Sequence, residues 1–114
     1  MIDHPISYGR QHIIDDDIQA VVDTLRSDYL TQGPRIPEFE QQFADYLGVQ
    51  YACMVSNGTA ALHLCAMALD IKPGDKVITT PITFVASANG FRYCGADIVF
   101  CDIDSKTFLM DLDK

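Results

Sequence analysis

Strand-like and helix-like segments alternate in the second half of the chain, and this alternation restricts the possible folds more than any other feature. Three apolar runs of strand length are separated by two stretches of helical periodicity, in the order 51–56, 58–70, 75–81, 83–95 and 96–104. Strands that are joined through helices pair in parallel, so the sequence predicts an α/β fold with a mainly parallel sheet. Ligands in such folds bind beyond the carboxyl ends of the strands.

The first half of the chain reads as a polar arm, residues 1–13, followed by two amphipathic helices and the loop between them. Residues 15–27 carry apolar side chains at helical spacing, with acidic residues in the first turn, where they suit the helix dipole. Residues 37–48 place aromatic side chains on one face, and Gly48 suits the C-terminal stop. The connecting loop, TQGPRIP, is rich in Gly and Pro. These residues are therefore expected to be helical, and the α/β region begins near residue 50.

Charge and cysteine spacing exclude several classes of protein. A formal charge of −8 opposes binding to nucleic acid or to an anionic membrane. No apolar run approaches the roughly 20 residues that span a bilayer, and Asp3 and His4 stand where a leader would be basic. The four cysteines form no CxxC pair, so we expect buried free thiols in a reducing compartment. The sequence therefore predicts a cytoplasmic protein without nucleic-acid or membrane partners.

The turn SNGT, residues 56–59, follows the first strand and opens a helix whose first amides and dipole favour an anion. Gly58 would let the backbone approach a ligand closely, and Thr59 could either cap the helix or give its hydroxyl to a phosphate. The turn matches neither the Walker A motif nor the dinucleotide fingerprint. An ordinary capped turn explains the octapeptide SNGTAALH equally well, so both interpretations stay open.

Phe84 stands at the second strand-to-helix turn, where we expect it one residue into the helix. Its ring could stack on a flat ligand at the carboxyl edge of the sheet. A plain core phenylalanine is the alternative.

An acidic cluster near the end of the chain raises the question of a metal site. The stretch DIDSKTFLMDLD lacks the central glycine and the terminal glutamate of an EF-hand loop, so a solvated acidic loop is expected and no metal is predicted. His63 has no nucleophile near it in sequence and reads as a structural helix histidine.

Several separate segments, in this order and spacing, resemble the DegT/DnrJ/EryC1/StrS family of sugar aminotransferases. The segments are LTQGP, FEQQFADYLG, SNGTAALHL, GDKVITTPITFVASAN and VFCDID. The resemblance extends from about Tyr8 to Asp113 and implies the fold-type I, aspartate aminotransferase-like architecture with pyridoxal 5′-phosphate (PLP) as the cofactor. Within the family, the sequence looks most similar to the branch that acts on UDP-linked 4-keto-6-deoxy-N-acetylhexosamines on the route to pseudaminic-acid-type sugars.

The resemblance assigns roles to individual residues. It implies that Thr59 and Ala60 contact the cofactor phosphate through their backbone amides and the Thr59 hydroxyl, that Gly58 permits the close approach, and that Phe84 stacks on the pyridine ring. It also places the TQGP loop beside the sugar-nucleotide pocket, which makes Thr31 and Gly33 candidates for substrate contact, although a simple interhelical turn explains them nearly as well. The implied partners are a nucleotide-sugar substrate, an amino-acid donor, usually glutamate, and a second subunit of a homodimer.

The catalytic groups of such an enzyme are not found in this sequence. Transamination needs a Schiff-base lysine and an acid that keeps the pyridine nitrogen protonated. The four lysines read as solvated surface residues, and none is assigned a catalytic role: Lys72, Lys76, Lys106 and Lys114.

We therefore expect the chain to be the N-terminal portion of an enzyme of several hundred residues. Residues 1–36 would form the arm, the first helix and an active-site loop, and residues 37–114 the first part of an incomplete PLP-binding large domain. The strand at 51–56 would then lack its native neighbours.

Three functions remain open at this point. The first is transamination of a nucleotide-linked keto sugar by the parent enzyme. The second is a relative on the same scaffold, either a sugar dehydratase, which histidine in place of the lysine would favour, or a regulatory protein that binds the cofactor without turnover. The third is a non-catalytic fragment that retains a phosphate-binding turn.

Overall fold

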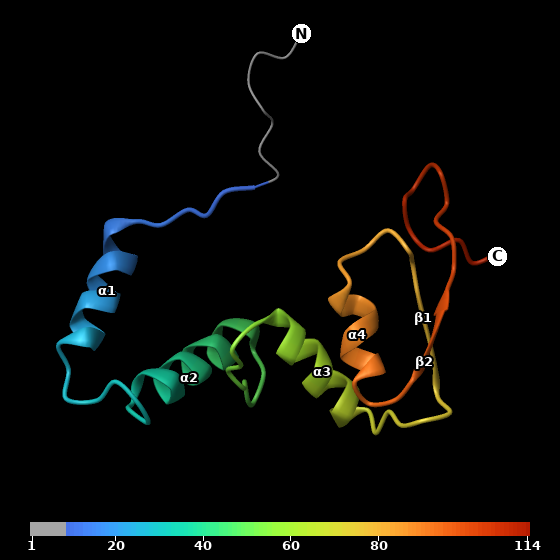
Figure 1. Cartoon of the computed structure of the whole chain (residues 1–114). Coiled ribbons are helices and arrows are strands. Elements are labelled where there is room, and N and C mark those ends of the chain that lie inside the picture. Colours follow the sequence, from blue (N-terminus) through green and yellow to red (C-terminus); the bar gives the residue numbers. More distant parts are fainter. Residues whose placement is uncertain (1–8) are drawn as a thin grey trace, which may run out of the picture. The chain divides into compact units, whose positions relative to one another are not determined.

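The computed structural model describes residues 9–114, and part of the expected N-terminal arm, residues 1–8, lies outside the described residues. The elements follow one another in the order α1 (Asp15–Leu25), α2 (Arg35–Leu47), α3 (Gly58–Ala68), β1 (Lys76–Thr79), α4 (Ala86–Arg92) and β2 (Asp97–Phe100) (Figure 1). The described chain divides into two compact units, which separate between Met54 and Val55. This division rests on packing alone, so the predicted domain boundary after residue 36 stays a prediction.

The first unit contains α1 and α2, and both predicted helices are confirmed. The amide of Ile14 donates to Asp17 Oδ2 at 3.0 Å, which fixes the entry to α1, and three aspartates occupy its first turn. In α2 the rings of Phe39 and Phe43 stack with centroids 5.7 Å apart. Gly48 ends α2 in the left-handed conformation, with φ of 66°, as its position predicts.

The first predicted strand, residues 51–56, is not a strand in this structure. Its backbone belongs to no ladder within residues 9–114, and the amide of Met54 instead donates to Glu40 Oε1 at 2.7 Å. A strand is defined by the hydrogen bonds to its neighbours, and apolar side chains alone do not supply them. The assignment of this segment as a strand was therefore wrong for the described residues.

The second unit contains a βαβ arrangement, which confirms the predicted parallel pairing. β1 and β2 pair in parallel, with Lys76 opposite Asp97 and Thr79 opposite Phe100. Backbone bonds from Asp97 to Asp75 (2.8 Å) and from Cys101 to Thr79 (3.0 Å) flank the ladder. Helix α4 connects the two strands and packs against both. The carboxyl ends of β1 and β2 consequently lie at one edge, next to the start of α4 (Figure 1).

Helix α4 is shorter than the sequence predicted. It spans Ala86–Arg92, and not residues 83–95, because each end is a tighter turn. At the start of the helix, the amide of Ser87 donates to the carbonyl of Phe84 at 2.9 Å, which lies only three residues earlier in the sequence. After it, Gly95 adopts φ of 92°, which favours glycine and stops the helix. Phe84 therefore precedes the helix and does not lie inside it.

Helices α3 and α4 pack closely because of Gly90. A Cβ atom at Gly90 would lie 2.9 Å from Leu62 Cβ and 3.1 Å from the Leu62 carbonyl carbon. The ring of His63, the residue after Leu62, meets the ring of Tyr93, about one turn after Gly90, edge to face with centroids 5.3 Å apart. Leu62 and Gly90 are each the fifth residue of their helix, so both helices start at the same end of the pair (Figure 1).

The described residues bury few side chains. Between residues 9 and 114 the buried apolar side chains are those of four alanines: Ala44, Ala66, Ala86 and Ala96. The cysteines are free thiols, as predicted, but their predicted burial was wrong, because Cys53 and Cys65 are exposed and Cys94 and Cys101 are half-buried. A position within an apolar segment of the sequence therefore did not ensure that its side chain is buried.

The close contact at Gly90 predicts that a side chain added there destabilises the protein. A helical glycine replaced by alanine normally stabilises a protein by roughly 0.5–1 kcal/mol, whereas overpacking costs typically about 1–3 kcal/mol. Because the obstructing atoms are backbone and Cβ atoms, Gly90→Ala is expected to lower the free energy of unfolding by ~1–2 kcal/mol in urea denaturation. Gly9→Ala, where a Cβ meets nothing within 4 Å, is the control. Higher stability of Gly90→Ala would contradict the packing described.

Candidate functional site

The start of α3 is held by Asn57. Asn57 is extended, with φ of −170° and ψ of 168°, and its Oδ1 accepts the amide of Ala60 at 2.9 Å. Its carbonyl accepts the amide of Ala61 at 3.2 Å, and its Nδ2 donates to Ser56 Oγ at 3.2 Å. Asn57 is therefore the N-cap, and the suggestion that Thr59 could cap the helix was wrong, because Thr59 is already the second helical residue. Sequence reasoning assigned Asn57 no role, although asparagine directly before a helical run is a known capping signal.

The cap leaves two amides free at the start of α3. The amides of Gly58 and Thr59 have no acceptor in the described part of the chain, whereas the amide of Ala60 is taken by Asn57. A Cβ at Gly58 would meet nothing within 4 Å, so the approach to these amides is open. The first turn of α3 carries no acidic residue. Two free amides at the positive end of a helix can bind one anionic oxygen group.

Phe84 lies in the turn that leads into α4. Its side chain is 74 % exposed, which argues against the core-phenylalanine interpretation within residues 9–114. Thr83 Oγ1 and Ser87 Oγ share a hydrogen bond of 2.9 Å across the same turn. Since α3 and α4 start at the same end of their pair, the structure brings this turn to the end where Gly58 and Thr59 lie (Figure 1).

Thr31 and Gly33 lie in the other compact unit, in the loop between α1 and α2. Thr31 is exposed, and a Cβ at Gly33 would lie 2.7 Å from Tyr29 Cβ and 3.1 Å from its carbonyl oxygen. Gln32 between them adopts φ of 55°, an uncommon conformation for a residue with a side chain. The tight turn alone therefore explains the glycine, and substrate contact at Thr31 and Gly33 stays a prediction.

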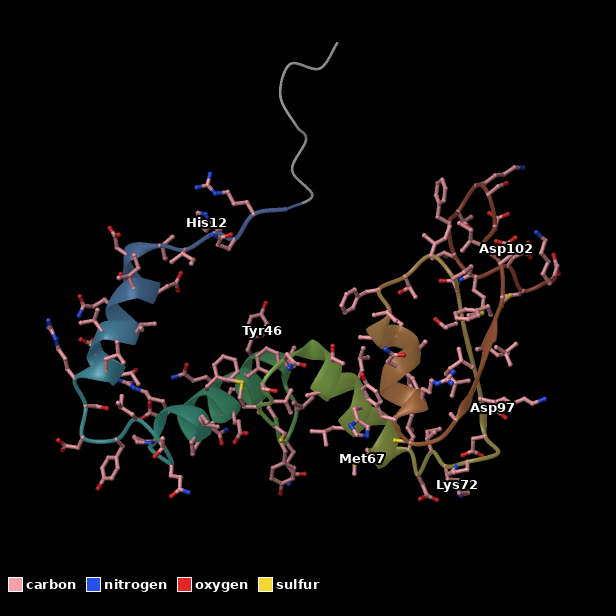
Figure 2. All side chains as sticks on the ribbon, viewed as in Figure 1. His12, Tyr46, Met67, Lys72, Asp97 and Asp102 are labelled. Atoms are coloured by element: carbon pink, nitrogen blue, oxygen red, sulfur yellow. The ribbon has the colours of Figure 1, made fainter. Side chains whose placement is uncertain are left out.

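The lysines of the described residues lie on the surface, as predicted. All four are exposed: Lys72, Lys76, Lys106 and Lys114. Lys72 pairs with Asp70 at 3.1 Å beyond the C-terminal end of α3, opposite the Asn57 end (Figure 2). Lys114 Nζ lies 3.6 Å from Asp102 Oδ2 and 3.7 Å from Asp111 Oδ2.

The acidic loop near the C-terminus uses its carboxylates to hold its own backbone. Asp104 Oδ1 accepts the amides of Thr107 at 2.7 Å and Lys106 at 3.1 Å, and the Thr107 hydroxyl at 2.9 Å. These bonds, led by the one from the Thr107 amide, hold the pKa of Asp104 below its ordinary value. Within residues 9–114, no three His, Cys, Asp or Glu side chains are grouped as metal ligands would be.

The helices of the described residues are all too short or too polar to cross a bilayer.

The model of one protein family matches residues 11–114, nearly the whole chain: the DegT/DnrJ/EryC1/StrS aminotransferase family. The chain belongs to this family. GDP-perosamine synthase from Caulobacter vibrioides is 51 % identical over 82 residues, 72 % of this chain and 22 % of that protein. UDP-4-amino-4,6-dideoxy-N-acetyl-beta-L-altrosamine transaminase from Campylobacter jejuni is 43 % identical over 98 residues, 86 % of this chain and 26 % of that protein.

The fold agrees with that of a solved structure. The PLP form of Spr1654 from Streptococcus pneumoniae superposes with a TM-score of 0.85 at 36 % identity, over 96 % of this chain and 28 % of that one. The predicted family and the α/β fold class are thus confirmed. The chain spans about a quarter of the length of the curated relatives it matches.

The hydrogen bonds around Asp104 predict how the acidic loop responds to pH. Because the folded-state pKa is lowered, the stabilisation from Asp104 is complete above its unfolded pKa, about 3.9, and is lost as the pH falls through the folded value. Carboxyl chemical shifts recorded by NMR should give a midpoint for Asp104 below that of an ordinary aspartate. Thr107→Val, which removes the hydroxyl but keeps both backbone bonds, should raise that midpoint. An unchanged midpoint in Thr107→Val would contradict the assignment.

Proposed function

We propose that the protein to which these residues belong is a PLP-dependent aminotransferase that acts on a nucleotide-linked sugar. The observation that carries the proposal is the first turn of α3, where two free amides with an open approach would accept a phosphate. Membership of the aminotransferase family supports it.

The residues at this end of α3 and α4 fit the cofactor. The amides of Gly58 and Thr59 and the Thr59 hydroxyl would bind the phosphate, and the exposed ring of Phe84 would stack on the pyridine ring. Ala60, whose amide already has an acceptor in Asn57, would contribute its small side chain next to the bound phosphate. When bound, PLP supplies an electron sink for breaking bonds at the amine-bearing carbon.

The cofactor-binding lysine is proposed to lie outside residues 1–114. All four lysines of the sequence are exposed, and Lys72 and Lys114 form surface ion pairs. We therefore propose that these residues are the N-terminal portion of the enzyme. They would hold the cofactor and exclude water from one side of it, while the proton transfers occur on groups elsewhere in the protein.

The finer assignment is a UDP-linked 4-keto-6-deoxy-N-acetylhexosamine as amino acceptor and glutamate as donor. The Campylobacter jejuni relative, whose name contains a UDP-linked amino sugar, supports this substrate class. Thr31 and Gly33 are proposed to border the nucleotide-sugar pocket. The enzyme is proposed to be a cytoplasmic homodimer.

The first test is the visible absorption spectrum of the full-length protein with PLP, before and after borohydride, together with the intact mass. We expect an absorption band that borohydride abolishes and a mass increase that peptide mapping places on one lysine outside residues 1–114. Amine transfer from glutamate to UDP- and GDP-linked 4-keto sugars would then identify the acceptor.

Other outcomes would support the other two functions. If the full-length protein has a histidine at the position of the Schiff-base lysine and binds the cofactor without a reducible absorption band, the proposed function changes from transaminase to sugar dehydratase. Binding of PLP without turnover, measured by isothermal titration, would leave a non-catalytic binding protein. No binding at all would refute the proposal.

Variants of Thr59 and Phe84 test the residue assignment. Phe84→Ala should weaken PLP binding about tenfold, since an aromatic stack contributes up to ~1.5 kcal/mol, and Thr59→Val should weaken it by a similar or larger factor through loss of a hydrogen bond to a charged group. The double variant should bind no measurable PLP in a titration of the full-length protein. Phe108→Ala is the matched control, because Phe108 is 73 % exposed and Phe84 74 %. Equal losses in Phe84→Ala and Phe108→Ala would refute a specific stacking role.

A further inference from the structure

Asn57 holds the first turn of α3 without placing a charge there. Its Oδ1 accepts the amide of Ala60 at 2.9 Å, and its Nδ2 is tied to Ser56 Oγ at 3.2 Å, so the carboxamide is fixed at both ends. The cap thereby fixes the first turn of α3 and leaves the amides of Gly58 and Thr59 without acceptors in the described residues. A neutral side chain thus lies directly beside two unpaired donors.

The charge pattern around α3 is unusual for this chain. The protein carries 16 acidic and 8 basic residues, yet residues 46–69 contain no Asp, Glu, Lys or Arg. Helix α1 shows the contrast, because its first turn holds Asp15, Asp16 and Asp17, whereas the first turn of α3 holds no acidic residue. The positive end of the α3 dipole is therefore offset by no carboxylate of its own turn.

Helix stability alone does not require asparagine at this position. Aspartate caps a helix about as well as asparagine and interacts more favourably with the dipole. An aspartate would nevertheless place a negative charge one residue from Gly58, where it would repel any anion bound to the free amides. The cost of the aspartate would therefore appear in ligand binding and not in folding.

We propose that Asn57 is a positioning residue that makes the α3 turn selective for the phosphorylated form of the cofactor. Its hydrogen bond to the Ala60 amide fixes the turn in which the amides of Gly58 and Thr59 stay free. Because its side chain is uncharged, it does not oppose the attraction between the positive end of the helix dipole and a dianionic phosphate. This inference rests on the proposed function and adds to it the group that sets its anion preference.

The experiment compares the affinities of the full-length protein for PLP and for pyridoxal, which lacks the phosphate. Without ligand, Asn57→Asp should have a thermal midpoint equal to or above that of the wild type, and it should keep its affinity for pyridoxal, but it should lose selectivity for PLP by about tenfold to a hundredfold. Asn57→Ser, a neutral cap, should keep the selectivity within about threefold. Asn89→Asp adds the same charge within α4, in neither of the two turns, and should leave the selectivity unchanged.

The outcomes separate a charge effect from a structural one. Equal selectivity in Asn57→Asp and the wild type, or equal losses in Asn57→Asp and Asn57→Ser, would overturn the proposal. If Asn57→Asp fails to fold, Ser56→Asp places the charge one residue earlier with Asn57 intact. Loss of selectivity there supports the proposal, and wild-type selectivity overturns it. A wild-type protein with no preference for PLP over pyridoxal would instead refute the proposed function itself.

Discussion

The parallel pairing of β1 with β2 is the constraint on which the second unit depends. Two parallel strands cannot be joined by a tight turn, so the chain must cross over through α4, which packs back on both strands. The crossover places Gly90 against Leu62 of α3, and the missing Cβ lets the two helices approach closely. Because both helices start at the same end of their pair, the turns at Asn57 and Phe84 come to one region. The proposed ligand, with a phosphate at one end and a flat ring at the other, would bind across that pair of turns.

The chemistry at this end of α3 follows from which backbone donors are satisfied. Asn57 accepts the amide of Ala60, and the amides of Gly58 and Thr59 remain free within the described residues. An unpaired amide that is open to solvent costs the folded protein little, because water can solvate it, yet it supplies a donor when an anion arrives. The cap therefore holds the start of α3, and its free amides are the donors that the proposed phosphate site would use.

The described residues carry many more apolar side chains than their own packing buries. The buried side chains are alanines, while larger ones such as Val21, Tyr51 and Leu112 are more than half exposed. The segment at 51–56 illustrates the cause, since its apolar sequence predicted a strand but strand formation needs backbone partners within reach. The burial predicted for the cysteines was wrong for the same reason. Apolar composition states which surfaces a chain can bury, and the neighbouring elements decide whether they are buried.

By itself, the sequence determined the family, through the resemblance of its motifs. It also determined the order of the helices and of β1 and β2, the parallel character of the sheet and the stop at Gly48, because these depend on local periodicity, turn residues and spacing, but the strand that it predicted at 51–56 did not form. It also marked the SNGT turn as a candidate anion site. Only the tertiary structure decided that Asn57 and not Thr59 caps α3, that Phe84 precedes α4 and that Gly90 sets the helix spacing. These features depend on the position at which a helix begins and on which side chains meet across it. The cap and the turn at Phe84 are settled by hydrogen bonds within four residues of sequence, and the asparagine before the helical run was a capping signal that could have been used. The Gly90 contact depends on Leu62 of another helix, which local residue types do not specify.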